Sequence, residues 1–167
     1  ITSLQSYLQK QYSEVINTNN ILSDNDCGAS ANVARGQSDC VILGKLITST
    51  NNGESLLVRR IIGTDNDLYN PSNDDITIFK TFNASIFILS GSKNDLVQET
   101  YPLEWGAALK SDLAAGQNIS NFSVLILRSP MSGAVRTFID NSMAISNNTQ
   151  LRAIINTPYT ANELKVC

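Results

Sequence analysis

The sequence predicts an α+β domain in which one N-terminal helix packs across an antiparallel sheet. Residues 1–22 carry apolar side chains at spacings of three and four, which is typical of an amphipathic helix. Most of the remaining chain consists of short apolar runs bounded by Asn, Gly and Pro, which favours strands. The 167 residues suffice for one domain with a sizeable core, and no linker or repeat divides them. We expect a helix at 1–22, a loop at 23–39 and a β-rich head at 40–167.

The first predicted element is the helix. Its apolar stripe consists of Leu4, Tyr7, Leu8, Tyr12, Val15 and Ile16. Thr2 or Ser3 would be a weak cap, because no acidic residue follows three positions later. We therefore expect the helix to begin before Ile1 and the chain to be the soluble part of a longer protein.

The predicted loop at 23–39 is polar and contains no apolar cluster that would hold it in place. Cys27 and Cys40 enclose most of it, so we predict a disulfide between them. Closing a loop of this size removes about 3 kcal/mol of unfolded-chain entropy. A zinc site is disfavoured because the chain has no histidine and no C-x-x-C pair. Cys167 is either a free buried thiol, a partner of one of the other two cysteines, or bridged to a cysteine outside the chain.

Three strand pairs and two closing strands are predicted after this loop. The strongest signal is Asn-Asn-Gly at 51–53, because these residues tolerate the positive φ of hairpin turns. The predicted pairs are 40–48 with 55–62, 76–82 with 85–89, 122–127 with 134–139, and 151–155 with 164–167 as closing strands. Residues 105–113 could form a second helix, although Gly106 weakens that prediction.

The chain has no recognisable catalytic set. Without histidine, Ser-His-Asp and Cys-His mechanisms are excluded, and no nucleophile elbow or phosphate-binding loop is present. Glu54, Glu99 and Glu104 lie beside turn signals and are interpreted as solvated carboxylates rather than as a glycosidase pair. We therefore expect a protein that is not an enzyme.

The net charge and the clusters of polar residues in the sequence suggest few ligands. The net charge is −3 and the 12 Lys and Arg residues are dispersed, so no nucleic-acid partner is expected. No cofactor is expected, but Asp65, Asp67, Asp74 and Asp75 are weak candidates for calcium, the alternative being that they only form turns. Tyr101, Trp105 and Tyr159 could stack on a sugar or could simply pack.

Several segments resemble type IV pilin-like proteins, of the kind found in Saccharibacteria-like candidate-phyla bacteria. They are Ser-Asp-Cys-Val-Ile-Leu-Gly-Lys-Leu at 38–46, Tyr-Pro-Leu-Glu-Trp-Gly at 101–106, and Leu-Ile-Leu-Arg-Ser-Pro-Met-Ser-Gly at 125–133. The helix followed by a cysteine-bounded loop also resembles that group. The prepilin cleavage site, the early glutamate and the hydrophobic helical segment of the family do not occur in this sequence, so none of the family's functional residues can be placed on it.

The resemblance implies the head of a type IV pilin or pseudopilin, at the bacterial cell surface. Such a subunit is anchored in the membrane before assembly, and its long helix then packs with those of other pilin subunits. The stripe at residues 4–16 would continue into that filament-packing helix. The sheet and loops would face outward, toward host or other surfaces, in attachment, motility or secretion. The alternatives are a secreted carbohydrate- or surface-binding module and, with less support, a carboxylate-dependent hydrolase.

Overall fold

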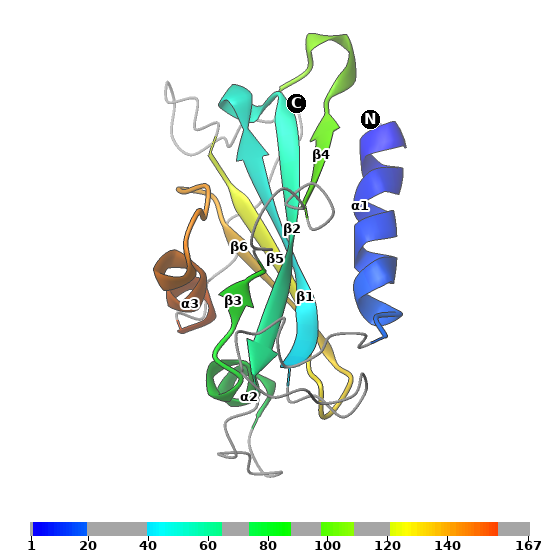
Figure 1. Cartoon of the computed structure of the whole chain (residues 1–167). Coiled ribbons are helices and arrows are strands. Elements are labelled where there is room, and N and C mark those ends of the chain that lie inside the picture. The colour runs from blue at the N-terminus through cyan, green and yellow to red at the C-terminus, as the bar shows by residue number, and fades with distance from the viewer. Residues whose placement is uncertain (1, 20–39, 65–73, 88–97, 109–120, 157–167) are drawn as a thin grey trace.

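The computed structural model describes residues 2–19, 40–64, 74–87, 98–108 and 121–156. In this part of the chain, an antiparallel sheet of six strands is covered by helices on both faces (Figure 1). The helix α1 (Thr2–Ile16) lies on one face, and α2 (Asp75–Thr81) and α3 (Asn148–Asn156) lie on the other. The predicted α+β class is therefore confirmed, as is the helix packed on an antiparallel sheet.

The central hairpin agrees with its prediction. Strands β1 (Cys40–Thr50) and β2 (Ser55–Thr64) pair antiparallel, and a short 3-10 turn, η2 (Asn51–Gly53), joins them. All three turn residues have positive φ, at 49°, 55° and 88°, which Asn and Gly tolerate better than other residues. The register shifts once, between Ile42 and Gly44, at a β-bulge.

The predicted hairpin of 122–127 with 134–139 also forms. Strands β5 (Ser123–Arg128) and β6 (Val135–Asp140) pair antiparallel, and β5 pairs with β1 on its other side. Two short strands, β3 (Ser85–Ile86) and β4 (Gln98–Pro102), share the outer edge of β2. The strand order is therefore β3-β2-β1-β5-β6, with β4 beside β3 on β2.

The prediction of a strand at 76–82 is wrong, because these residues form α2. Asp74 caps this helix: its carboxylate accepts a hydrogen bond from the Thr77 amide at 2.7 Å. Ile78, Phe79 and Phe82 then lie on one buried helical face. Alternating apolar residues at 76, 78 and 82 resembled a strand pattern, but the cap and the pair at 78–79 favour a helix.

The prediction of a closing strand at 151–155 is also wrong. These residues belong to α3, which Asn147 caps by accepting a hydrogen bond from the Gln150 amide at 3.0 Å. The Gln150 side chain in turn accepts a hydrogen bond from the Ser146 amide. The amides of Ser146 and Gln150, at the start of the helix, therefore both have a partner. The other predicted closing strand, at 164–167, lies outside the described residues.

The expected second helix at 105–113 is not present in its described part. A 3-10 turn, η4 (Glu104–Gly106), follows β4 there, and residues 107–108 are extended or irregular. Trp105 has a φ of 63°, a left-handed conformation that interrupts helical geometry. Residues 109–113 lie outside the described residues.

Two apolar clusters occupy the two faces of the sheet. The larger one fills the space between the sheet and the pair α2 and α3, and it contains Leu43, Leu46, Ile61, Phe79, Leu125, Leu127, Ile145 and Leu151. The smaller one lies under α1 and contains Leu4, Tyr7, Val15, Ile47, Leu56, Val58, Phe122 and Ile126. Among the helices of the described residues, none has the length and apolar character needed to cross a bilayer.

Helix α1 is shorter than the predicted 1–22, because it ends at Ile16. The side chains of Asn17 and Thr18 donate hydrogen bonds to the carbonyls of Ser13 and Glu14, at 2.9 and 2.8 Å. The Ser13 carbonyl also keeps the Asn17 amide, whereas the Thr18 hydroxyl takes the place of the Thr18 amide that a continuing helix would have bonded to the Glu14 carbonyl. Residues 20–22 lie outside the described part of the chain.

Candidate functional site

The apolar stripe predicted on the first helix divides into two parts. Leu4, Tyr7 and Val15 are buried against the sheet, and Leu8 is half-buried. Tyr12 and Ile16 are 41% and 43% exposed, so the six residues of the stripe do not all lie on the buried face of the helix. The reason is geometric, since each step of four residues advances about 40° around a helix. From Leu4, three such steps carry Ile16 well away from the sheet.

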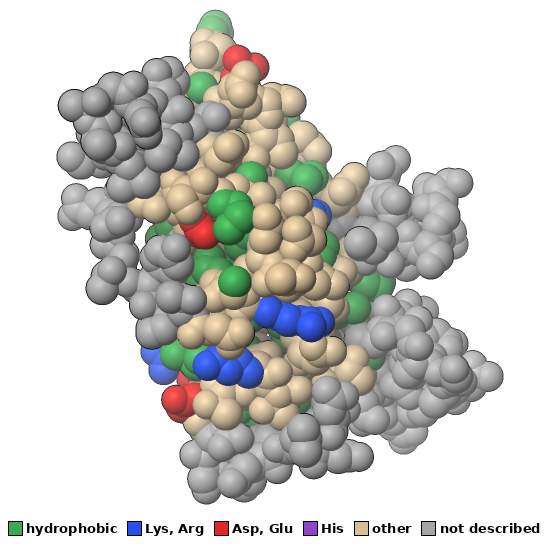
Figure 2. Space-filling model, turned by 90° about the vertical axis from the view of Figure 1, so that its left-hand side faces the viewer, with side chains coloured by type: hydrophobic (Ala, Val, Ile, Leu, Met, Phe, Trp, Pro, Cys, Tyr) green, Lys and Arg blue, Asp and Glu red, His purple; other side chains and the backbone are tan. Residues whose placement is uncertain are grey.

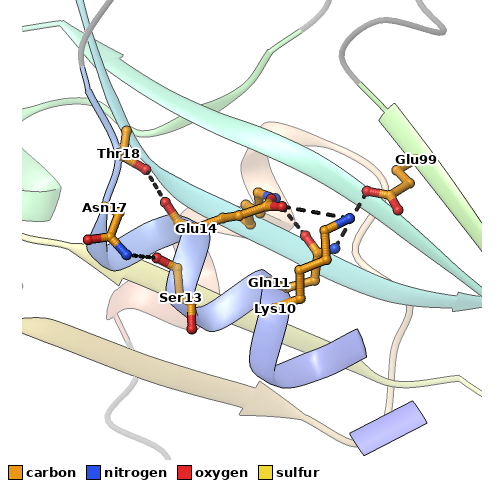
Figure 3. Close-up of polar contacts among 8 residues, drawn as sticks. Lys10, Gln11, Ser13, Glu14, Asn17, Thr18 and Glu99 are labelled. Atoms are coloured by element: carbon orange, nitrogen blue, oxygen red, sulfur yellow. Dashed lines mark hydrogen bonds and ion pairs between the residues drawn. The ribbon is translucent and has the colours of Figure 1, made fainter. Parts of the chain in front are cut away.

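Gln11 takes the central place on the buried face of α1. Its side chain is fully buried, and it lies on the same face as Tyr7 and Val15. The amide nitrogen Nε2 donates to Glu99 Oε2 on β4 at 3.5 Å, and Oε1 accepts from Lys45 Nζ on β1 at 2.5 Å. Figure 3 shows Gln11 between α1 and the sheet, with Glu99 approaching from a neighbouring strand. A buried amide is thus satisfied by polar groups on two strands.

Lys45 joins α1 to the centre of the sheet. Its side chain is only 15% exposed, and Nζ also forms an ion pair with Glu14 Oε2. Glu14 in turn lies 3.7 Å from Lys10 Nζ, in an exposed i,i+4 pair (Figure 3). Burial alone would raise the pKa of Glu14, but the hydrogen bond and charge of Lys45, with the charge of Lys10, lower it overall. Glu14 therefore stays ionised and holds the helix to β1.

An aromatic pair lies at the other end of this interface. The rings of Tyr7 on α1 and Tyr101 on β4 stack with centroids 4.0 Å apart and an interplanar angle of 16°. The Tyr7 hydroxyl is buried without a hydrogen-bond partner among the described residues. Burial raises the pKa of Tyr7, and the negative charge of Glu99 raises it further. Tyr7 is therefore neutral, and it acts as a packing residue.

A shallow apolar groove runs beside α1, on the side away from β4. It has a volume of about 510 Å³, and we call it the α1 groove. It is lined by Leu8, Gln9, Tyr12, Ser13, Ile47, Val124, Ile126 and Thr137. The exposed ring of Tyr12 forms part of its wall. Of the apolar strand side chains that line it, Ile47 and Ile126 are buried and Val124 is half-buried.

The predicted calcium carboxylates have structural roles where the structure describes them. Asp74 caps α2, and a hydrogen bond from the Thr77 amide lowers its pKa. Asp75 accepts a hydrogen bond from Ser132 at 2.7 Å and pairs with Arg136 at 3.4 Å. Asp65 and Asp67 lie outside the described residues. Within the described ranges, no group of three His, Cys, Asp or Glu side chains could hold a metal ion.

The cysteine prediction is not tested by this structure. Cys40 is buried at the start of β1, beside Ile62 and Phe87. Cys27 and Cys167 both lie outside the described residues. The Cys27–Cys40 disulfide therefore stays a prediction.

The three aromatic candidates for sugar stacking do not share one role. One face of Tyr101 is covered by Tyr7. Trp105 is 98% exposed at the turn that follows β4, and Tyr159 lies outside the described residues. Of the two candidates that the structure describes, Tyr101 and Trp105, only Trp105 is fully exposed to solvent.

Sequence reasoning missed the polar contacts under α1. A signal for them was present, because Gln11 interrupts the apolar stripe and Lys45 interrupts the apolar run of β1. A lysine within a buried strand needs a partner for its charge, and a glutamine on a buried helical face needs partners for its amide. Arg59 on β2 is also partly buried, and its guanidinium donates a hydrogen bond to the Ile145 carbonyl. Burial lowers its pKa.

Comparisons with known proteins found no relative of this chain. No protein-family model matches the chain, and neither the curated proteins nor the solved structures gave a match.

Proposed function

We propose that this chain is the head of a type IV pilin-like structural subunit, which works by assembling with other copies and has no catalytic role. The observation that carries the proposal is the two-sided character of α1. One side is buried on the sheet, while Tyr12 and Ile16 on the other side are 41% and 43% exposed. A helix that only closed a domain core would have polar residues at these positions.

The α1 groove supports the same proposal. The exposed ring of Tyr12 and the half-buried side chain of Val124 on β5 both line it, above the buried Ile47 and Ile126. Large side chains exposed next to one another are typical of surfaces that bind other proteins. In the proposed filament, this surface packs against other pilin subunits, and the full-length protein is anchored in the membrane before assembly.

The remaining surface has a different character. On the side that carries α3, neutral polar groups make up most of the described surface, and the lysine and arginine side chains lie mainly in its lower half in this view (Figure 2). We propose that this side faces outward on the bacterial surface.

The proposal is tested by locating the protein and by changing the exposed helix residues. Antibodies against the head should label filaments on the cells that produce it, as seen by immunogold electron microscopy. The double variant Tyr12→Ser, Ile16→Ser should reduce filament number while the purified head melts within a few degrees of wild type. The matched control is Trp105→Ser, which removes an exposed aromatic side chain from a different part of the molecule. Label found only in the culture medium, or filaments unaffected by the double variant, would contradict the proposal.

Trp105 favours a second candidate, a secreted carbohydrate- or surface-binding module. Its ring is 98% exposed, and its φ of 63° is unfavourable for a non-glycine residue. An exposed aromatic ring held in a strained turn is suited to stacking on a sugar. Glycan-array binding that is lost in Trp105→Ser would support this second function, and a blank array would exclude it for the glycans tested.

A further inference from the structure

A polar pocket lies at the C-terminal end of α1, on the same face of the sheet. Its volume is about 270 Å³, and it is lined by Glu14, Thr18, Asn19, Ile42, Gly44, Lys45 and Arg60. It shares only Lys45 and Glu14 with the contacts that hold α1 to the sheet. The proposed function does not use it.

The strand register places two cations side by side in this pocket. Lys45 on β1 is directly opposite Arg60 on β2. Both line the pocket, so both side chains are on the α1 face. Directly opposed like charges destabilise an antiparallel pair unless an anion lies between them. This pair needs two negative charges for full compensation.

Among the described residues that line the pocket, Glu14 supplies one of them. Lys45 is paired with Glu14 and is only 15% exposed. No hydrogen bond or ion pair joins the guanidinium of Arg60 to any other residue that the structure describes. With Lys45, Arg60 and Glu14 counted together, the pocket carries one uncompensated positive charge.

The helix end adjacent to the pocket does not cancel this charge. The C-terminal carbonyls of a helix carry a partial negative charge, which repels anions. Here the carbonyls of Ser13 and Glu14 accept hydrogen bonds from Asn17 and Thr18. The guanidinium of Arg128 on β5 also donates to the carbonyl of Thr18, at 3.4 Å. Donors from within the chain therefore already satisfy several of the carbonyls at this end.

We propose that this pocket binds one carboxylate group of an acidic monosaccharide, with Arg60 as the main contact. A guanidinium presents two parallel N–H groups that match the two oxygens of a carboxylate. A volume of about 270 Å³ suits a single sugar ring rather than a longer ligand. Thr18 and Asn19 provide polar side chains for the ring hydroxyls, and Ile42 provides an apolar wall. This inference does not depend on filament assembly.

The test compares glucuronate with glucose, its neutral counterpart, using the whole 167-residue chain. Isothermal titration calorimetry should detect binding of glucuronate to the protein. Acetate should bind more weakly than glucuronate, because it lacks the ring hydroxyls. Glucose should bind at least about tenfold more weakly, since it lacks the charge-assisted contact. Binding of glucose as tight as that of glucuronate would overturn the proposal, as would tighter binding of acetate or inorganic phosphate.

A matched pair of variants locates the site. Arg60→Gln should weaken glucuronate binding by about tenfold or more, whereas Arg136→Gln, on the opposite face, should leave it unchanged. In the absence of ligand, Arg60→Gln should melt at the same or a higher temperature than wild type, because it removes one of two opposed cations. Glucuronate binding that survives Arg60→Gln, or is lost equally in both variants, would overturn the proposal.

Discussion

Lys45 and Lys10 are two residues that pair with the same carboxylate from different surroundings. Lys45 is 15% exposed and also donates a hydrogen bond to Gln11, whereas Lys10 is 58% exposed and pairs, among the described residues, with Glu14 alone. Lys45→Met should lower the free energy of unfolding by about 1–3 kcal/mol, since it leaves the buried Gln11 amide without its donor. Lys10→Met should change it by less than about 0.5 kcal/mol. Urea denaturation of both variants checks this, and equal effects would show that burial of the lysine is not decisive.

Glu14 gives the interface a dependence on pH. Its pKa in the folded protein is lowered from its usual value of 4.5. A carboxylate with a lowered pKa adds stability above the unfolded value, and that stability is lost as the pH falls through the folded value. The difference in stability between wild type and Glu14→Gln should therefore shrink between about pH 6 and about pH 3. Thermal melts of both proteins across this pH range test the prediction. A difference that does not change with pH would mean that the Glu14–Lys45 ion pair contributes nothing to stability.

At the scale of elements, α3 depends on its cap. The Asn147 side chain accepts a hydrogen bond from the Gln150 amide, and the side chains of Leu151, Ile154 and Ile155 on the helix are buried. Asn147→Ala should cost about 1 kcal/mol of stability, and Asn147→Ser, which can still cap, should cost less than half of that. Chemical denaturation of the two variants measures the difference. Identical losses would show that the side chain stabilises the protein in some way other than capping.

Elements whose signals are local could be predicted from the sequence. The Asn-Asn-Gly turn and the Pro and Gly turn at 129–133 each specify a hairpin, because the positive φ they allow does not depend on the rest of the fold. The segments at 76–82 and 151–155 are short and apolar, and such runs suit a strand or a buried helix equally well. Only the capping residues before them distinguish the two, at Asp74 and Asn147.

The site was harder to predict than the fold because its contacts join distant segments. Gln11 meets Lys45 and Glu99 only after α1 crosses β1 and β4. The opposition of Lys45 and Arg60 depends on the hairpin register that the turn at Asn51–Gly53 sets. Residue type alone indicates that a buried lysine needs a partner, but it does not say which one.

For the whole molecule, the sheet has a stable centre. Residues 44–48 of β1 are paired with β2 on one side and with β5 on the other, and apolar clusters cover both faces. Their amides should exchange with deuterium more slowly than those of β6, which is paired with β5 alone among the described strands. Hydrogen-exchange mass spectrometry tests this order. Faster exchange in β1 than in β6 would mean that the sheet opens from its middle.

The arrangement of β3 and β4 along β2 limits how copies of this protein can meet. Strands β4 and β3 cover β2 at Ser55–Arg59 and at Ile61–Ile62, so two short strands replace one long edge. The other edge of the described sheet is β6, with six residues that include Arg136 and Asp140. Short and charged edges are poor templates for strand addition from another chain. In the assembly proposed above, copies would therefore associate through side chains without growing into a shared sheet, which keeps ordered assembly separate from amyloid-like aggregation.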